Sequence, residues 1–109
     1  MTDSDRKLQE MQIIEQSLQN IIMQKQAFQM EQSETESALE EIKSSGDEVF
    51  KIVGQLMIKT EKKKIKEELE NKKRLLDLRL TNLEKQETTL MEKLETIREE
   101  VIEGNKKKK

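Results

Sequence analysis

The side chains of this chain that could act as acids or bases are carboxylates and lysines, because the sequence contains no His, Cys or Tyr. Two pairs of neighbouring carboxylates occur, Glu40 with Glu41 and Glu99 with Glu100. Adjacent residues of a helix do not face each other, and nothing in the sequence predicts a pocket that would keep one of them as an acid. We therefore predict solvated carboxylates and a protein that is not an enzyme.

Metal and nucleotide sites are also not predicted. The segment Ser44-Ser45-Gly46-Asp47 lacks the ligand spacing of a calcium loop, and no glycine-rich phosphate loop is present. The absence of Cys excludes thiolate zinc sites and disulfides. We expect no cofactor.

The lysines are concentrated in KTEKKKIKEE, residues 59 to 68, and in the terminal Lys106 to Lys109. In the first stretch they alternate with glutamates, and no aromatic residue stands beside them to stack on a base. The whole chain has a net charge of −2. This pattern is typical of a solvated helix start, and we expect no nucleic-acid binding. The terminal lysines are predicted to be a disordered tail over residues 104 to 109 that could touch an acidic partner.

Composition places the chain outside the usual globular class. Of its 109 residues, 32% are hydrophobic, 2% are aromatic and 40% are charged, which suits either long coiled-coil helices or a disordered chain. The first residues lack the apolar core of a secretory signal, and no run approaches the roughly 20 apolar residues of a membrane span. We expect a soluble, cytoplasmic protein.

Heptad spacing decides in favour of helices. From Met11 onward, position a falls on residues 11, 18, 25, 32 and 39, and position d on residues 14, 21, 28, 35 and 42. A second apolar seam runs from Ile65 to Val101, with a shift in register expected near Leu75 and Leu76. The sequence predicts helices over about residues 5 to 43 and 61 to 103 of one single unit, 1 to 109.

Between the predicted helices the pattern changes. Residues 44 to 47 are helix-ending and turn-forming types, and Gly54 separates two short apolar runs, VFKIV and QLMIKT. The sequence therefore predicts a β-hairpin over about residues 48 to 59, with its turn type left open. Both faces of such a hairpin would be apolar and its edges free, so we predict an assembly surface there.

With a hairpin between them, the two helices should run antiparallel as a coiled coil. The residue numbers of two facing residues should then add up to about 105. This predicts Ile14 beside Met91 and Gln32 near Lys72. The ends of this coil carry more apolar residues than one seam requires. These off-seam residues are Ile13, Ile22, Met23, Met30, Met91 and Ile102. A wider buried stripe is one explanation, and a surface that binds non-native chains is the other.

Three stretches together resemble the β-type subunit of prefoldin, most closely the archaeal form. They are IIMQKQAFQMEQSETESALEEI (residues 21 to 42), DEVFKIVGQLMIKT (47 to 60) and LTNLEKQETTL (80 to 90). The order and spacing of these stretches match that family over nearly the whole chain. The terminal GNKKKK departs from the more acidic or Gln-rich end of the family.

The resemblance implies a mainly α protein, a long antiparallel two-helix coiled coil joined by a short β-hairpin that oligomerises into a β-barrel body. It implies an ATP-independent chaperone, a holdase, in a hexamer of two α-type and four β-type subunits that passes unfolded clients to a group II chaperonin. By the same resemblance, subunit assembly would fall to Val49, Phe50, Ile52, Val53, Leu56, Met57 and Ile58. Client binding would fall to Met11, Ile13, Ile14, Ile22, Met23, Leu94, Ile97, Val101 and Ile102.

Two other functions stay open on the sequence. One is a structural or adaptor coiled coil that bridges defined partners through the central apolar block. The other is a helical hairpin associated with nucleic acid through its lysines. Broad protection of unrelated unfolded proteins would separate the chaperone from the adaptor, and affinity for nucleic acid at low salt would indicate the third.

Overall fold

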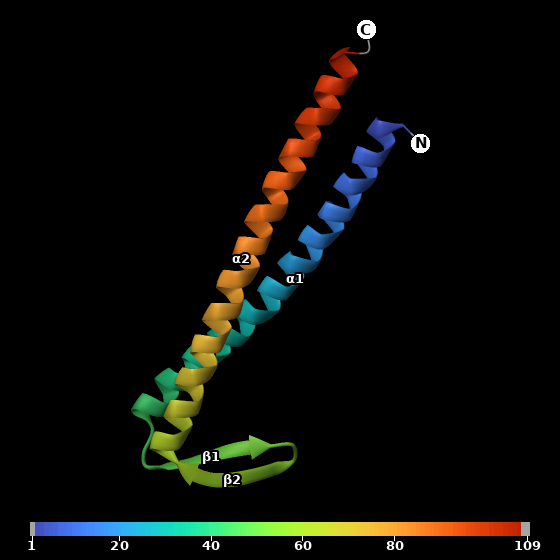
Figure 1. The fold of residues 1–109 in the computed structure, drawn as a ribbon. Helices are drawn as coiled ribbons and strands as arrows, with labels where there is room; N and C mark the ends of the chain where they lie inside the picture. Colours follow the sequence, from blue (N-terminus) through green and yellow to red (C-terminus); the bar gives the residue numbers. More distant parts are fainter. Residues whose placement is uncertain (1, 108–109) are drawn as a thin grey trace. The chain divides into compact units, whose positions relative to one another are not determined.

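The computed structural model describes residues 2 to 107. Along the chain, one long helix precedes a two-stranded antiparallel sheet and a second long helix follows it (Figure 1). Helix α1 spans Asp3–Ser44, strand β1 spans Glu48–Val53, strand β2 spans Leu56–Glu61 and helix α2 spans Lys62–Lys107. This arrangement confirms the predicted mainly helical fold with a central β-hairpin.

The far end of α2 corrects one expectation. The helix continues to Lys107, whereas the sequence analysis ended it near residue 103 and predicted a disordered tail from residue 104. A single Gly inside a helix costs only about 1 kcal/mol, and no proline follows Gly104 to stop the helix. Lys108 and Lys109 lie outside the described residues.

Local hydrogen bonds define both ends of α1. Thr2 and Asp5 form a reciprocal capping box, in which the Asp5 N–H donates to Thr2 Oγ1 at 3.2 Å and the Thr2 N–H donates to Asp5 Oδ2 at 3.3 Å. At the other end, the Ser45 hydroxyl donates to the Ile42 carbonyl at 2.9 Å. Lys62 Nζ donates to the Ser45 carbonyl at 2.8 Å, which ties the start of α2 to the segment that ends α1.

The chain divides into two compact units, Met1–Gln26 with Thr81–Lys109, and Ala27–Leu80. We refer to these as the terminal unit and the hairpin unit. The terminal unit buries Ile14, Ile21 and Leu83, and the hairpin unit buries Leu76 and Leu80. All ten predicted a and d positions of α1 are buried or half-buried, which confirms its heptad register.

In α2 the register shift occurs earlier than predicted. The less exposed residues step by four from Ile65 to Leu69 and again to Lys73, after which steps of three and four alternate. These two steps of four and the following step of three to Leu76 make an 11-residue repeat, which locally changes the supercoil of a coiled coil. The shift therefore lies before Leu75, whose side chain is exposed, rather than at Leu75 and Leu76.

Pairs across the two helices show how they meet within each unit. In the terminal unit, Lys7 Nζ lies 3.5 Å from Glu100 Oε2, and Lys25 Nζ donates to Glu87 Oε1 at 3.2 Å. In the hairpin unit, Lys73 Nζ lies 3.7 Å from Glu36 Oε1. The opposite directions of the two helices are therefore as predicted.

The exact partners differ from those predicted, however. Gln32 donates to Asp77 rather than lying beside Lys72, about one turn further along α2. Every helical side chain leans toward the N-terminus of its own helix. In an antiparallel pair both partners lean in this way, so long side chains meet residues with higher numbers than backbone positions alone suggest.

The polar side chains around Thr35 keep their hydrogen bonds inside the coil. Thr35 occupies a d position and is almost fully buried, and its hydroxyl donates to the Glu31 carbonyl at 2.8 Å. The neighbouring Gln32 is bonded to Asp77. No buried side-chain nitrogen or oxygen lacks a hydrogen-bond partner among the described residues. A buried polar group that keeps its hydrogen bond carries little penalty.

The hairpin has a two-residue turn, because Val53 pairs with Leu56 and leaves only Gly54 and Gln55 between the strands. Gly54 has φ of 62°, and no described residue other than glycine has a positive φ. A positive φ at the first turn residue alone identifies a type II′ turn, which matches the twist of the strands it joins. This determines the turn type that the sequence left open.

Replacing Gly54 by Ala should destabilise the hairpin by about 1–2 kcal/mol, because an L-residue is strained at this φ. A Cβ added there would meet nothing within 4 Å, so the loss would come from the backbone alone. Hydrogen exchange of the β1 and β2 amides measures it. Gly46→Ala is the matched control, because a Cβ there also meets nothing and the φ of Gly46 is not positive. Equal losses in the two variants would contradict this explanation.

Candidate interaction surfaces

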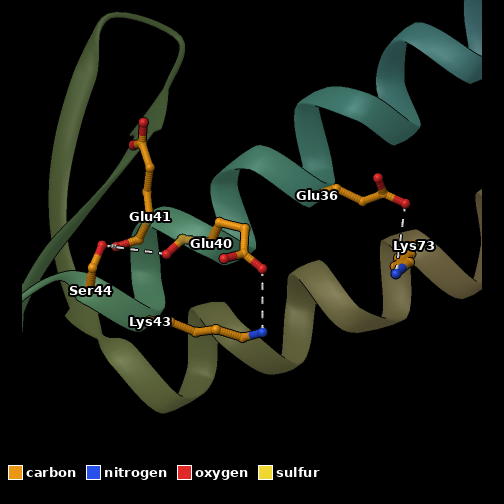
Figure 2. A network of polar contacts seen from close by, with 6 residues as sticks. All are labelled: Glu36, Glu40, Glu41, Lys43, Ser44 and Lys73. Carbon is orange, nitrogen blue, oxygen red and sulfur yellow. Dashed lines mark hydrogen bonds and ion pairs between the residues drawn. The ribbon is translucent and has the colours of Figure 1, made fainter.

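Of the four carboxylates considered for acid–base chemistry, Glu40 and Glu100 lie in surface ion pairs. Figure 2 shows Glu40 paired with Lys43 at 3.5 Å, while Ser44 Oγ donates to the Glu41 carbonyl at 3.1 Å. Glu40 and Glu41 are both exposed, and so are Glu99 and Glu100 near the end of α2. This arrangement is that of a solvated helix surface.

The described residues also contain no group of three or more His, Cys, Asp or Glu that could hold a metal ion. Among the same residues, no helix is both long enough and apolar enough to cross a membrane. The surfaces that distinguish this molecule are instead apolar, and they occur in both compact units.

One hairpin face, which we call the Phe50 face, consists of Phe50, Ile52 and Met57 with Lys59 and Glu48. Strand pairing places Phe50 opposite Lys59 and Ile52 opposite Met57. All three apolar side chains are more than half exposed, and Lys59 Nζ lies 3.6 Å from Glu48 Oε1 beside them. Nothing within the described chain covers this face.

The opposite face is covered only near the helices. There Val49 and Thr60 are half-buried, and Lys51 Nζ donates to Glu68 Oε2 of α2 at 3.0 Å. Val49 also lines a hollow of about 490 Å³ with Ile42, Ile65 and Leu69 among its walls. Toward the turn, which lies away from both helices in Figure 1, Val53, Leu56 and Ile58 are exposed.

The hairpin therefore exposes apolar residues on both faces, together with the outer edges of a sheet that has only two strands in the described chain. Six of the seven residues predicted for assembly are exposed, and Val49 is half-buried. Such a sheet is marginal alone in water and is completed by pairing with further strands or by burial. Its chemistry is that of an association surface.

The terminal unit separates the residues predicted for client binding into two groups. The exposed group lies off the seam, with Ile13 at 66% and Met23 at 67% exposure, and Ile22 and Ile102 near one half. The remaining residues belong to the seam between the helices. Of these, Ile14 is buried, and Met11, Leu94, Ile97 and Val101 are half-buried. The exposed group can meet a partner without any change in the coiled coil.

Ile13 connects the two groups, because it lines a groove between the helices. The groove has a volume of about 550 Å³, and its walls include Ile14, Leu90 and Ile97. Leu90 lines this groove together with Ile14, whereas the predicted partner Met91 is exposed. The groove extends the apolar surface of Ile13 into the seam.

Among the exposed large apolar residues, Leu8, Leu75 and Leu78 were not singled out for function from the sequence. Leu75 and Leu78 are each 58% exposed on α2 of the hairpin unit. Their position off the heptad seam was the only available signal, and the assumed register shift near Leu75 obscured it. The contact between Arg79 and Phe28 was also not predicted from the heptad positions. The Cζ atom of Arg79 lies 5.5 Å from the centroid of the Phe28 ring.

Comparison with protein families gives a match over nearly the whole chain. The family model described as "Prefoldin subunit" matches residues 5 to 108. Prefoldin subunit beta of Thermococcus onnurineus is 44% identical over 89 residues, covering 80% of this chain and 77% of that relative. Prefoldin subunit beta of Thermococcus kodakarensis is 42% identical over 92 residues, covering 83% and 79% of the two chains.

The fold is similar to that of a solved structure as well. The crystal structure of the prefoldin beta subunit from Thermococcus strain KS-1 matches with a TM-score of 0.88 and 37% sequence identity. That match covers 95% of this chain and 93% of the other. Sequence and fold therefore indicate the same family, and that family is the one the three quoted stretches resemble.

Proposed function

Since the chain belongs to the prefoldin subunit family, whose members are chaperones rather than enzymes, we propose that it is a β-type subunit of an ATP-independent holdase. In this proposal the chain works in the cytoplasm, where it captures unfolded proteins and delivers them to a group II chaperonin. The observation that carries the proposal is the exposure of Ile13, Met23 and Ile102 in a terminal unit whose seam residues are already buried or half-buried between the helices.

Assembly is proposed to take place through the hairpin. Two α-type and four β-type subunits would form a hexamer in which the exposed hairpin residues are buried in β-barrels. The support for this is physical, because the Phe50 face and the turn end of the hairpin are apolar and uncovered. Pairing with strands of neighbouring subunits would also satisfy the free strand edges.

Client capture would work by burial of apolar surface without a nucleotide. At about 25 cal/mol per Å², one terminal unit that covers a few hundred Å² gains several kcal/mol before ordering costs. Several subunits around one client would add their contributions through effective concentration. Weak single contacts that are strong together allow a holdase both to hold a client and to release it.

The proposed client surface can be tested by replacing Ile13, Met23 and Ile102 with Ser in one variant. Suppression of aggregation should fall several-fold for a set of unrelated denatured proteins, because about 1 kcal/mol or more of apolar burial is lost at each position. Light scattering during dilution from denaturant measures this suppression, and native mass spectrometry of the complex with an α-type partner measures assembly.

A variant with Leu75 and Leu78 replaced by Ser is the matched control, because both side chains are similarly exposed but lie in the hairpin unit. It should protect clients as the unmodified chain does. Unchanged protection by the triple variant would remove these residues from the client surface. If the triple variant lost binding to a single defined protein and kept all general protection, the adaptor alternative would be favoured.

A further inference from the structure

Within the terminal unit, residues 11 to 26 of α1 differ from α2 in the charge of their exposed side chains. Of the ten exposed residues between 11 and 26 in α1, only Glu15 is charged. Of the seventeen exposed residues between 81 and 103 in α2, nine are charged. Both stretches belong to the same coiled coil, so their common fold does not explain the difference.

Six of the nine uncharged exposed residues between 11 and 26 lie on one side of α1. At 100° per residue, this side is opposite the seam residues Ile14, Leu18 and Ile21. Glu15 falls outside this stripe, which we call the amide face. The amide face consists of Gln12, Ile13, Gln16, Gln19, Asn20 and Met23, all of them exposed.

Helix packing does not require this composition, since the side of a coiled-coil helix opposite its seam is ordinarily charged and fully solvated. Glutamine and asparagine offer both a donor and an acceptor, and an amide costs far less to remove from water than a charged group. A stripe of amides around Ile13 and Met23 is therefore easy to desolvate and can bond to a peptide backbone.

The surface shape around Ile13 agrees with this composition. A shallow hollow of about 450 Å³ on α1 is lined only by uncharged residues, Gln9, Gln12, Ile13, Gln16 and Ser17. The groove on the other side of Ile13 has Glu10, Glu92 and Lys93 in its walls. Ile13 thus separates an uncharged hollow from a charged one.

We propose that the amide face of α1 binds uncharged, extended segments of unfolded polypeptides. Apolar client side chains contact Ile13 and Met23, and the glutamine amides bond to the client backbone. A charged segment would lose water without gaining an opposite charge, so the face selects against it. This inference rests on the proposed function. It specifies that the bound client segment is uncharged and that α1 binds it.

The test uses the full chain assembled with its α-type partner and two end-capped, dansyl-labelled peptides. One is made of Val, Leu, Gln and Ser, and the other has Lys in place of each Gln. Fluorescence anisotropy should show that the uncharged peptide binds at least about threefold more tightly than the Lys peptide, because the amide face carries no opposite charge for the lysines.

The Gln16→Glu and Gln16→Lys variants should each weaken binding of the uncharged peptide at least about threefold, whatever the sign of the added charge. Gln86→Glu and Gln86→Lys are the matched controls, because Gln86 is exposed on α2 in the same unit. Their affinities should equal that of the unmodified complex. Circular dichroism checks that helix content is unchanged in all four.

Other results would overturn the inference. Equal losses from the Gln16 and Gln86 variants, no loss from either, or tighter binding of the Lys peptide would each do so. If the Gln16 variants instead changed self-association of the complex in sedimentation, the face would be an interface between copies. If the complex bound neither peptide but still suppressed aggregation, this inference alone would fail. If it bound neither and suppressed nothing, the proposed holdase function would fail with it.

Discussion

An Ile52→Asp variant is expected to leave both helices folded and to prevent assembly of the complex. Ile52 is 71% exposed on the Phe50 face, so the isolated chain loses little by the change. In an assembled hairpin, the substitution would remove about 1.5–3 kcal/mol of apolar burial and place an unpaired carboxylate in an apolar interface. We expect the dissociation constant of the complex to rise at least about 100-fold.

Sedimentation at several concentrations measures this dissociation, and circular dichroism shows whether helix content persists. Ile13→Asp is the matched control, because Ile13 is similarly exposed but lies in the terminal unit. This control should assemble normally. An Ile52→Asp chain that still forms the full complex would show that the hairpin face is not the assembly surface.

A Leu76→Ala variant is expected to lose about 2–4 kcal/mol of stability against unfolding. Leu76 is only 3% exposed, at a d position of α2 where the steps of three and four resume after the register shift. Truncation there removes buried methyl groups and leaves a cavity in the seam. Urea unfolding followed by circular dichroism measures the change.

The neighbouring residue provides an unusually close control. Leu75 has the same side chain on the same helix, but it is 58% exposed, so Leu75→Ala should change stability by no more than about 0.5 kcal/mol. If the two variants lost similar stability, Leu76 would not be a core residue of the coil. The pair thus tests directly where the register of α2 lies after the shift.

The helices and the hairpin could be predicted because their signals are local. Heptad spacing from Met11 to Ile42 specifies which side of α1 is buried whatever it packs against, and all ten positions are buried or half-buried. The turn-forming residues at 44 to 47 and Gly54 similarly interrupt helix by their own backbone preferences. The apolar strands around Gly54 also predicted which apolar side chains the hairpin exposes.

Features that depend on a partner helix or strand could not be predicted from the spacing of apolar residues along the sequence. Lys25 with Glu87 and Gln32 with Asp77 are decided by the lean of long side chains toward each other. The register shift before Leu75 and the type II′ turn depend on how α2 and β2 approach the rest of their unit.

The sequence by itself thus determined the elements of this protein, their order and the faces they bury, because the period of apolar residues and the backbone preferences act over a few neighbours. The tertiary structure decided which apolar residues stay exposed, such as Ile13 and Leu75, and which polar residues are paired across the helices. Exposure and pairing depend on residues far apart in the chain, and only the folded backbone brings these together.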